Sequence, residues 1–366
     1  MSGSFLGLPI LLEPIKTRYN HKPYITMTTC VGSPRTETTP HRGSDRSHGE
    51  NSLYNCMEFY RPSFTNLLSC TPSGHNQEKQ NQTRRIVVKE IEEEEKKYDL
   101  WMKMKEEASI DVQQEPILSS YYFSSILSHN SLESALANHL SIKLSNSVIP
   151  VNTLFALFVG VFMEDEEIIG AIKDDLKAVK ERDPACMSYV HCFLNFKGFL
   201  ACQAHRAAHK LWLQGRKASA LLIQNRISEV FAVDIHPGAK IGHGILLNHA
   251  TGIVIGETVV IGNNVSILHN VTLGGTGKDA GDRHPKIGDG VLIGAGSNVL
   301  GNVRIGEGAK IGAGSVVLKE VPPRTTAVGS PARLVGGKAN PVRLHHIPSL
   351  SMDHTSHVVE WSDYVI

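Results

Sequence analysis

Five histidines in the second half of this 366-residue chain are the side chains best suited to moving a proton near neutral pH: His236, His243, His249, His269 and His284. Histidine can act in that pH range as a general base or as a metal ligand. A single histidine is more often a surface or corner residue, so its neighbours must decide which of the five takes part in chemistry.

His249 has the neighbour that a general base needs. Asp234 precedes it by fifteen positions. In a solenoid of roughly 18 residues per coil, that separation brings the two side chains close together. An aspartate hydrogen-bonded to a histidine fixes its tautomer and stabilises the imidazolium that forms during proton transfer. The pair predicts general-base catalysis by His249, oriented by Asp234.

Other residue types narrow the chemistry further. Arg283, directly before His284, carries a planar guanidinium that suits a substrate carboxylate. Six cysteines without a Cys-x-x-Cys pair are too few for a disulfide framework and do not form a cysteine zinc site. Those in the middle of the chain are interpreted as buried, small apolar residues. These cysteines are Cys186, Cys192 and Cys202. The sequence therefore predicts catalysis by a base acting on bound substrates, without a covalent intermediate.

A six-residue repeat must position these side chains. Thirteen aliphatic residues recur at every sixth position, from Ile235 to Val271 and again from Ile287 to Val317, and no Phe, Tyr or Trp occurs between Ala232 and Glu360. β-Branched residues suit short strands, and glycine, which often follows them, permits tight corners. Such coils bury their aliphatic side chains only by stacking on one another. The pattern predicts a left-handed parallel β-helix over residues 233–333.

The repeat is interrupted once. Sixteen residues separate Val271 from Ile287, ten more than one hexad. The segment 274–285 is therefore predicted to leave the wall as a loop, and loops on rigid repeats are common functional sites. Its glycines suit a close approach to a ligand, but it lacks the Gly-x-x-x-x-Gly-Lys-Ser/Thr pattern of a phosphate loop.

The preceding segment, residues 98–232, has a helical pattern. Trp101, Met104 and Ala108 recur at spacings of three and four, and Ser131 has the position of an N-cap. Residues 1–97 show no sustained periodicity and are predicted to be disordered or to act as a transit peptide. The first 49 residues hold six Lys and Arg against three acids, a bias that transit peptides share, and Met27 is a possible second start. The expected fold class is α+β and multi-domain, ending in an extended tail over 334–366.

Composition excludes several classes. The net charge is +1, from 37 Lys and Arg against 36 Asp and Glu, so there is no electrostatic case for a nucleic-acid partner. The longest apolar run, Thr153 to Met163, is too short to span a bilayer and predicts a buried helix. With 41% hydrophobic and 20% charged residues, the chain is expected to be a soluble globular protein, located in the cytosol unless residues 1–97 direct it to a plastid or mitochondrion.

From about Asp99 to Ile366, the chain closely resembles the serine O-acetyltransferases, and most closely the plant enzymes. The hexads alone indicate only the wider acyltransferase superfamily, whereas the helical segment and the Gly-Asp-Arg-His-Pro-Lys loop are much more specific. The residues that carry the resemblance are Arg182-Asp183-Pro184-Ala185, Lys197-Gly198-Phe199, Gln203-Ala204-His205-Arg206, Val233-Asp234-Ile235-His236-Pro237, His249-Ala250-Thr251-Gly252, Gly256-Glu257-Thr258, Val271 to Lys278 and Gly281 to Ile287.

The resemblance implies that acetyl-CoA and L-serine give O-acetyl-L-serine and CoA, the committed step toward cysteine. His249 is then the base and Asp234 its partner. Asp183 holds the serine ammonium and Arg283 the carboxylate, with His284 in the same pocket. No permanently bound cofactor is expected. Acetyl-CoA, the co-substrate, is expected to contact the backbone near Gly275 and Thr276 and the side chains near Ala295, Lys310 and Ala313.

One departure from the family pattern lies in the expected site. The family usually has aspartate immediately before the base, where this chain has Asn248. Asparagine keeps the hydrogen bonding but loses a negative charge near the substrate ammonium. Serine affinity is then weaker, unless Asp183 alone suffices.

The C-terminus and the exposed coil walls predict partners. In the resembling family the terminal isoleucine, here Ile366, enters the active site of O-acetylserine (thiol) lyase to form the cysteine synthase complex. An aliphatic side chain with a free carboxylate suits such capture. The family also forms trimers and dimers of trimers, so a homo-oligomer is expected.

Three alternatives remain open at this point. The γ-class carbonic anhydrases use the same solenoid with three histidines on zinc, but they lack a long helical N-terminal segment. Another hexapeptide-repeat acyltransferase, acting on a sugar or other small molecule, is the second alternative. The third is a largely regulatory subunit of the cysteine synthase complex, whose catalysis has decayed through Asn248.

Overall fold

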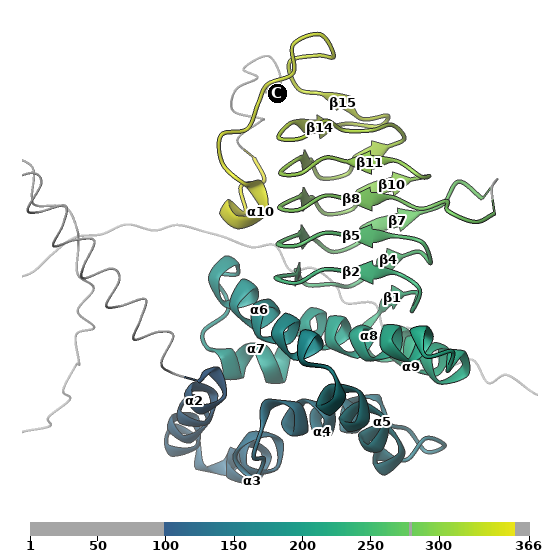
Figure 1. The fold of residues 1–366 in the computed structure, drawn as a ribbon. Coiled ribbons are helices and arrows are strands. Elements are labelled where there is room, and N and C mark those ends of the chain that lie inside the picture. Colours follow the sequence, from purple (N-terminus) through teal and green to yellow (C-terminus); the bar gives the residue numbers. More distant parts are fainter. Residues whose placement is uncertain (1–98, 278–279, 356–366) are drawn as a thin grey trace, which may run out of the picture. The chain divides into compact units, whose positions relative to one another are not determined.

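The described part of the chain, residues 99–277 and 280–355 of a computed structural model, begins with helices and continues as stacked coils of short strands. Figure 1 shows the two parts and their element labels. Neither described range contains a helix long and apolar enough to cross a membrane. The helical elements are α2 (Leu100–Gln114), η1 (Pro116–Leu118), α3 (Ser119–Tyr122), η2 (Phe123–Leu127), α4 (Leu132–Leu144), α5 (Val151–Glu164), α6 (Glu166–Arg182), α7 (Tyr189–Asn195), α8 (Lys197–Leu213) and α9 (Lys217–Phe231).

Local sequence explains where these helices begin and which side they bury. The Ser131 hydroxyl accepts a hydrogen bond from the Ser134 amide at the start of α4, as its N-cap position predicts. On α2 the buried residues are Trp101, Met104 and Ala108, which is the predicted stripe. The helical interpretation of this segment is confirmed.

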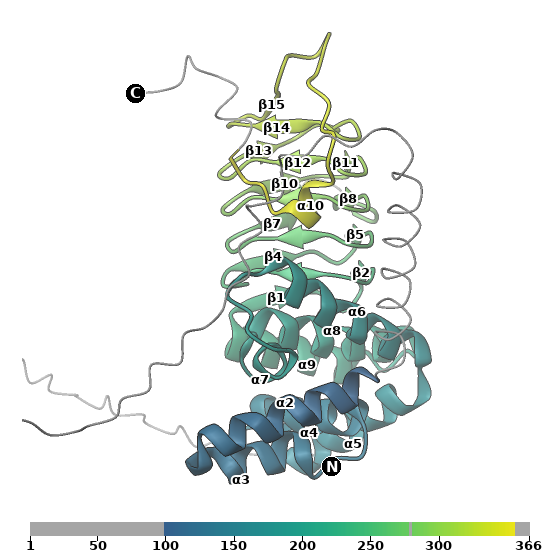
Figure 2. The ribbon, with the colours of Figure 1, turned by 90° about the vertical axis from the view of Figure 1, so that its left-hand side faces the viewer.

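The coils form three parallel sheets, one on each side of a triangular solenoid, and Figure 2 shows the stack from the side. One sheet has the order β1-β4-β7-β10-β13, the second β11-β8-β5-β2, and the third β15-β14-β12-β9-β6-β3, where only β15 is antiparallel. The fold class predicted from the hexads is confirmed. The strands are β1 (Val233–Ile235), β2 (Lys240–Ile241), β3 (Leu246–Leu247), β4 (Ile253–Ile255), β5 (Val260–Ile261), β6 (Ser266–Ile267), β7 (Thr272–Gly274), β8 (Lys286–Ile287), β9 (Leu292–Ile293), β10 (Asn298–Leu300), β11 (Arg304–Ile305), β12 (Lys310–Ile311), β13 (Val316–Val317), β14 (Thr326–Val328) and β15 (Arg333–Leu334).

The first coil is longer than the hexads predict. Val233 pairs with Ile253, twenty positions later, whereas Val254 pairs with Thr272, eighteen positions later. The two additional residues fall in the corner between β3 and β4, where His249 and Ala250 have φ of 55° and 56°. Positions two apart in a hexad, such as Ile253 and Ile255, are both buried. The hexad count therefore passes over this insertion without a visible break.

The loop before β8 is shorter than the hexads predict, for the same reason. Thr272 pairs with Asn298, 26 positions later. Compared with the regular coil of eighteen, formed where Asn298 pairs with Val316, the loop adds eight residues rather than ten. The difference arises because the two extra residues of the first coil shift the inward-facing positions by two residues along the sequence. Leu273 is therefore the last buried aliphatic residue before the loop.

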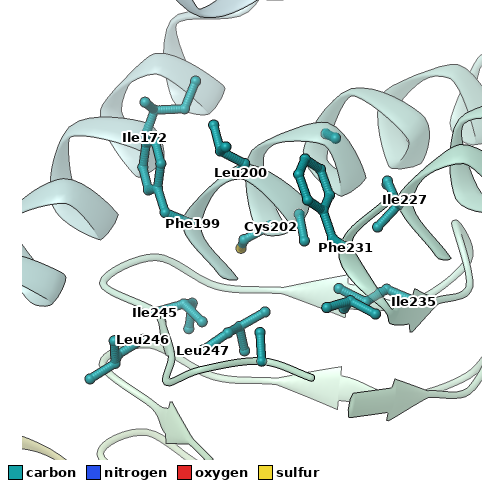
Figure 3. Close-up of a cluster of buried hydrophobic side chains, with 14 of the residues drawn as sticks. Ile172, Phe199, Leu200, Cys202, Ile227, Phe231, Ile235, Ile245, Leu246 and Leu247 are labelled. Atoms are coloured by element: carbon teal, nitrogen blue, oxygen red, sulfur yellow. The ribbon is translucent and has the colours of Figure 1, made fainter. Parts of the chain in front are cut away.

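Helices α6, α8 and α9 pack against the open end of the first coil. Figure 3 shows Phe199 and Phe231 from the helices above Ile235, Ile245 and Leu247 from the coil. The coils themselves contain no Phe, Tyr or Trp, so the large rings at this end of the solenoid core come from the helices. The helices and the coils therefore share one hydrophobic core, within a single compact unit of the chain.

A buried ion pair fixes the helices to the coil. Arg206 Nη2 lies 2.6 Å from Asp175 Oδ2, and both side chains are almost fully buried. Each member also bonds to the coil backbone: Arg206 donates to the carbonyl of Gly242, and Asp175 accepts from the amide of Ile245. Gln203 of α8 bonds to both members. A buried pair with satisfied partners defines the docking geometry, and loss of one member leaves an uncompensated charge.

The C-terminal segment turns back over the third sheet. It contains the helical turn α10 (Pro348–Ser351), and the Ser266 hydroxyl of β6 donates to the carbonyl of Ser349 at 3.0 Å. Lys310 of β12 is 1% exposed, and its ammonium lies 3.6 Å from the Asp353 carboxylate. The predicted partner residue Ile366 lies outside the described residues.

Candidate active site

Two corners of the solenoid carry four of the six residues predicted for catalysis and serine binding. We name the turn Asn248–Gly252, which joins β3 to β4, the His249 corner. We name the turn Arg283–Pro285, which leads into β8, the Arg283 corner. The first joins the third sheet to the first sheet, and the second joins the first sheet to the second. The two corners therefore lie on different edges of one triangular solenoid.

Asp183 and Asn248 meet at the His249 corner. Asp183 is the C-cap of α6, is 9% exposed, and accepts a hydrogen bond from the Ala185 amide at 2.9 Å. Its second oxygen accepts from Asn248 Nδ2 at 3.1 Å. The amide at position 248 is thus a donor toward the carboxylate, and an aspartate there could not make this bond. His249, the next residue, is exposed.

Asp234 and His249 lie on neighbouring stretches of backbone, but no hydrogen bond joins their side chains within the described ranges. The Gly252 amide donates to the Ala232 carbonyl, so the His249 corner lies beside the start of β1. Val233 and Ile235 face the core and Asp234 faces outward, where its Oδ1 accepts from Gln224 Nε2 at 2.7 Å. The predicted dyad stays a prediction.

His269 lies directly above His249 on the next coil. β3 pairs with β6, and the two rings meet edge to face with centroids 6.0 Å apart. The Nδ1 atom of His269 is buried without a hydrogen-bond partner among the described residues. The sequence shows His269 as one of five histidines but gives no reason to prefer it, because its position above His249 depends on the two extra residues of the first coil.

The Arg283 corner is a preformed polar cluster. Arg283 Nη2 lies 2.9 Å from Glu257 Oε2, and the Arg283 amide donates to the Thr258 hydroxyl. The Thr258 amide donates to His284 Nδ1 at 3.2 Å, so the ring proton of a neutral His284 is on Nε2. Gly256 leaves room for this ring, since a Cβ there would lie 2.2 Å from it. The predicted residues Arg283 and His284 both belong to this cluster, together with Glu257 and Thr258, which the sequence does not single out as site residues. Their role in binding a substrate stays a prediction.

Hydrogen bonding, burial and charge lower the pKa values of three titratable side chains at and beside this corner. The hydrogen bond from Arg283 lowers the pKa of Glu257, which keeps that carboxylate ionised. Burial, followed by the charge of Arg283, lowers the pKa of His284. Burial likewise lowers the pKa of His236, which lies on the same edge of the first coil. His284 is therefore a neutral hydrogen-bond donor near neutral pH, beside a cationic Arg283.

A pocket on the third sheet contains three of the residues predicted to contact acetyl-CoA. Ala295 and Ala313 follow β9 and β12 at the position that His249 and His269 occupy on the lower coils, as the backbone hydrogen bonds between coils show. The pocket therefore continues the line of the two histidines along one edge. Its lining includes Leu268, Leu292, Ala295, Lys310, Ala313 and His354.

The other predicted coenzyme contacts lie elsewhere. Gly275 and Thr276 follow β7 at the start of the loop, where the Arg283 side chain lies 3.5 Å from the position of a Gly275 Cβ. They do not line the pocket on the third sheet. Within the described ranges, no group of three or more His, Cys, Asp or Glu side chains has the arrangement of a metal site.

Comparison with known proteins gives one family. The serine acetyltransferase N-terminal family matches residues 100–204, and the bacterial transferase hexapeptide family (six repeats) matches residues 284–319. Serine acetyltransferase 1, chloroplastic, of Arabidopsis thaliana is 62% identical over 341 residues, which are 93% of this chain and 100% of that protein. Serine acetyltransferase 3, mitochondrial, of the same plant is 61% identical over 343 residues, covering 93% of this chain and 86% of that protein.

Solved structures agree. Soybean serine acetyltransferase complexed with serine has 64% sequence identity and a TM-score of 0.63, covering 64% of this chain and 97% of that chain. Serine acetyltransferase in complex with coenzyme A from Brucella abortus strain S19 has 44% identity and a TM-score of 0.65, covering 68% and 99%. With such identity over nearly its whole length, this chain belongs to the serine acetyltransferase family.

Proposed function

We propose that this protein transfers the acetyl group of acetyl-CoA to the hydroxyl of L-serine, giving O-acetyl-L-serine and CoA. The observation that carries the proposal is the His249 corner. There an exposed imidazole adjoins a carboxylate suited to an ammonium group, and the same edge leads to the pocket of Ala295 and Ala313. Serine and coenzyme A are bound by the soybean and Brucella relatives.

His249 acts as the general base. It takes the proton of the serine hydroxyl while that oxygen attacks the thioester carbonyl, and the imidazolium then returns the proton to the departing CoA thiolate. No covalent enzyme intermediate is needed. Asp234 orients His249 through Oδ2, because Oδ1 is bound to Gln224. Base assistance of this kind contributes roughly 10²–10⁴-fold to the rate.

His269 supplies a hydrogen bond to the developing oxyanion. An unpaired buried N–H is rarer than an unpaired acceptor, so the buried, unpartnered Nδ1 of His269 carries the lone pair and Nε2 carries the proton. That Nε2–H has no partner among the described residues, and His269 lies along the edge between His249 and the pocket. A preformed donor at this place stabilises negative charge on the thioester oxygen.

Serine is held at both of its charged groups. Asp183, with Asn248 beside it, binds the ammonium, and Arg283, held by Glu257, binds the carboxylate with His284. Because the two groups come from different edges of one solenoid, a complete site needs the Arg283 corner of a second copy. The proposed assembly is therefore a homo-oligomer, a trimer or a dimer of trimers, with sites between subunits.

Acetyl-CoA lies along the edge above His269. Ala295 and Ala313 leave room for it because their side chains are small, and Gly275 and Thr276 of a neighbouring subunit offer backbone N–H groups. Lys310 contacts the coenzyme only if the ammonium turns from Asp353, to which it is now paired. The residues of the pocket therefore fit the coenzyme, with the C-terminal segment as part of its wall.

The activity is tested by release of CoA thiol from acetyl-CoA in the presence of L-serine. His249→Ala is expected to lower turnover at least 100-fold, the lower part of the range for a lost general base. His243→Ala is the matched control, since His243 is also an exposed histidine of the first coil, and it is expected to keep turnover. Near-normal turnover of a folded His249→Ala protein would remove the base assignment.

Two finer proposals follow from the family. O-Acetylserine (thiol) lyase binds the C-terminal Ile366, and deletion of this residue is expected to abolish the binding measured by calorimetry while acetyl transfer is retained. Undiminished binding would reject the partner.

The proposed location is the cytosol, or a plastid or mitochondrion if residues 1–97 act as a transit peptide. The names of the two Arabidopsis relatives favour an organelle. Fusion of residues 1–97 to a fluorescent protein distinguishes these locations.

A further inference from the structure

Arg182, the last residue of α6, bridges two coils of the solenoid. It is 6% exposed. Its Nη1 donates to the Gly244 carbonyl at 2.9 Å and to the Ser266 hydroxyl at 3.3 Å, and its Nη2 donates to Asn264 Oδ1 at 3.0 Å. Gly244 belongs to the first coil, and Asn264 and Ser266 to the second. A planar guanidinium is suited to such divergent acceptors because its donors point in fixed directions.

The next residue, Asp183, depends on where Arg182 is held. Asp183 caps α6, and its backbone amide donates to Val179 within that helix. Its carboxylate has hydrogen-bond partners in the Ala185 amide, which belongs to the same turn, and in Asn248. Among the described residues, only the Asn248 bond links the carboxylate to the coil. Arg182, one residue away, makes three further hydrogen bonds to the coils. It therefore fixes where the end of α6 meets the His249 corner.

The same network reaches the C-terminal segment. The Ser266 hydroxyl accepts from Arg182 and donates to the Ser349 carbonyl of α10 at 3.0 Å. The Ser266 hydroxyl thus joins the end of α6 to the side of the third sheet that carries the coenzyme pocket. The bond from Ser266 to the Ser349 carbonyl does not involve Arg182, so a change at Arg182 is expected to leave the pocket lining in place.

We propose that Arg182 is a positioning residue for the amino-acid substrate: it holds the Asp183 carboxylate at hydrogen-bond distance from Asn248 and aimed at the serine ammonium. This inference rests on the proposed function. It assigns to Arg182 an effect on serine binding and none on the binding of acetyl-CoA. A purely structural role would instead lower folding stability and leave both Michaelis constants unchanged.

The test compares Arg182→Lys with Arg226→Lys. Arg226 is a matched control because it is equally buried, at 8% exposure, and also donates to backbone carbonyls, those of Leu144 and Ser145. It lies in α9, and its partners Leu144, Ser145 and Glu229 all belong to the helical part. A lysine ammonium cannot reach acceptors on two coils at once. Arg182→Lys is expected to raise the serine KM about tenfold, the loss of one well-placed charged hydrogen bond, while the acetyl-CoA KM stays within about twofold.

A second variant covers the case in which Arg182→Lys fails to fold. Asn264 has φ of 56°, which glycine adopts readily, so Asn264→Gly removes one acceptor of Arg182 without backbone strain. It is expected to raise the serine KM about threefold, as a partial loss of the same positioning.

Three outcomes overturn the inference. The first is a serine KM of Arg182→Lys no higher than that of Arg226→Lys at a comparable thermal midpoint. The second is an equal rise of both Michaelis constants. The third applies if Arg182→Lys does not fold, and is an unchanged serine KM in Asn264→Gly. Absence of serine-dependent CoA release in the unchanged protein is a different result, since it rejects the proposed function itself.

Discussion

At the scale of single residues, Asn248 decides the charge of the site. Its amide donates to Asp183 at 3.1 Å, so the His249 corner holds one buried carboxylate and a neutral partner. An aspartate at position 248 would place two carboxylates at this distance. Like charges so close raise the pKa of one member of the pair, unless a cation such as the serine ammonium lies between them.

Asn248→Asp is therefore expected to lower the folding stability of the free protein and to leave serine binding equal or stronger. The lost hydrogen bond and the repulsion are expected to lower the free energy of unfolding by about 1–3 kcal/mol. At pH 8, where both carboxylates can be ionised in the complex, the serine KM is expected to stay equal or to fall. Kinetics at pH 8, with thermal midpoints measured with and without serine, check both effects. A large rise in the serine KM would show that residue 248 is not beside the ammonium.

The sequence predicts the residues of this site better than their arrangement. His249 and Arg283 are singled out by residue type and position, whereas Asp183 enters the prediction only through the family resemblance. His269 and Glu257 do not follow, because their roles depend on which residue of the next coil lies above or below. The register of His249 and His269 is fixed by the two extra residues of the first coil, and that of Glu257 and Arg283 by the loop inserted before β8.

At the scale of elements, Gly198 determines how closely α8 approaches the His249 corner. A Cβ at this position would lie 2.0 Å from the Leu247 carbonyl oxygen and 3.1 Å from Ala250 Cβ. Beside it, the Lys197 ammonium donates to the Thr251 hydroxyl of the same corner. The start of α8 thus holds the backbone on both sides of His249.

Gly198→Ala is expected to displace α8 from this corner. Because the obstructing atom is a backbone oxygen, the strain is expected to cost about 1–3 kcal/mol of unfolding free energy. Turnover is expected to fall as His249 moves. Gly160→Ala is the control, since a Cβ at Gly160 has no heavy atom within 4 Å, and alanine there in α5 should stabilise by up to about 1 kcal/mol. Urea unfolding measures both variants. Equal stabilisation of the two would mean that α8 does not contact the corner so closely.

His139 of α4 is expected to make the folding stability of the protein depend on pH. Burial lowers the pKa of His139 to about 4 from the ordinary 6.5, and Nε2 donates to the Leu194 carbonyl. As the pH falls below 6.5, the unfolded chain takes up a proton that the folded chain does not, so folding stability falls between pH 6.5 and 4. The loss is about 1.4 kcal/mol per pH unit from this residue.

The comparison of wild type with His139→Gln isolates this contribution. Glutamine keeps a donor for Leu194 and does not titrate. Between pH 7.5 and 5.5, the wild type is expected to lose about 1.4 kcal/mol more unfolding free energy than the variant. Identical pH dependence of the two proteins would show that His139 is protonated in the folded state.

The elements themselves are largely predictable from sequence. Short β-branched strands at six-residue spacing have few alternatives to stacked coils, and Trp101, Met104 and Ala108 mark the buried side of α2 directly. The coil lengths are not predictable in the same way. Ile253 and Ile255 both face inward, so a shift of two residues leaves an aliphatic residue in register. Eight inserted residues then look like ten.

At the scale of the whole molecule, the proposed site is not complete within one subunit. In the proposal, the edge between the third and first sheets holds the base and the ammonium group, and the edge between the first and second sheets holds the carboxylate. Packing of subunits around a threefold axis brings one edge of each solenoid against a different edge of its neighbour. Activity should then depend on intact corners in adjacent subunits.

Mixed oligomers test this arrangement. His249→Ala and Arg283→Ala are each expected to be nearly inactive alone. Co-expressed in equal amounts, they are expected to recover about one quarter of the activity per site, since a quarter of random subunit contacts join two intact corners. The control pair is His249→Ala with Asp183→Ala, where both changes affect the same corner and no recovery is expected. No recovery in the first mixture would place the whole site within one subunit.

The most direct measurement of the central claim follows the acetyl group itself. Acetyl-CoA with an isotope-labelled acetyl group is incubated with L-serine and the protein, and the amino-acid product is identified by mass spectrometry together with the CoA released. The unchanged protein is expected to form labelled O-acetyl-L-serine and CoA in equal amounts, and His249→Ala to form at least 100-fold less in the same time. Release of CoA without a labelled serine ester, or equal ester formation by His249→Ala, would contradict acetyl transfer to serine by a His249 base.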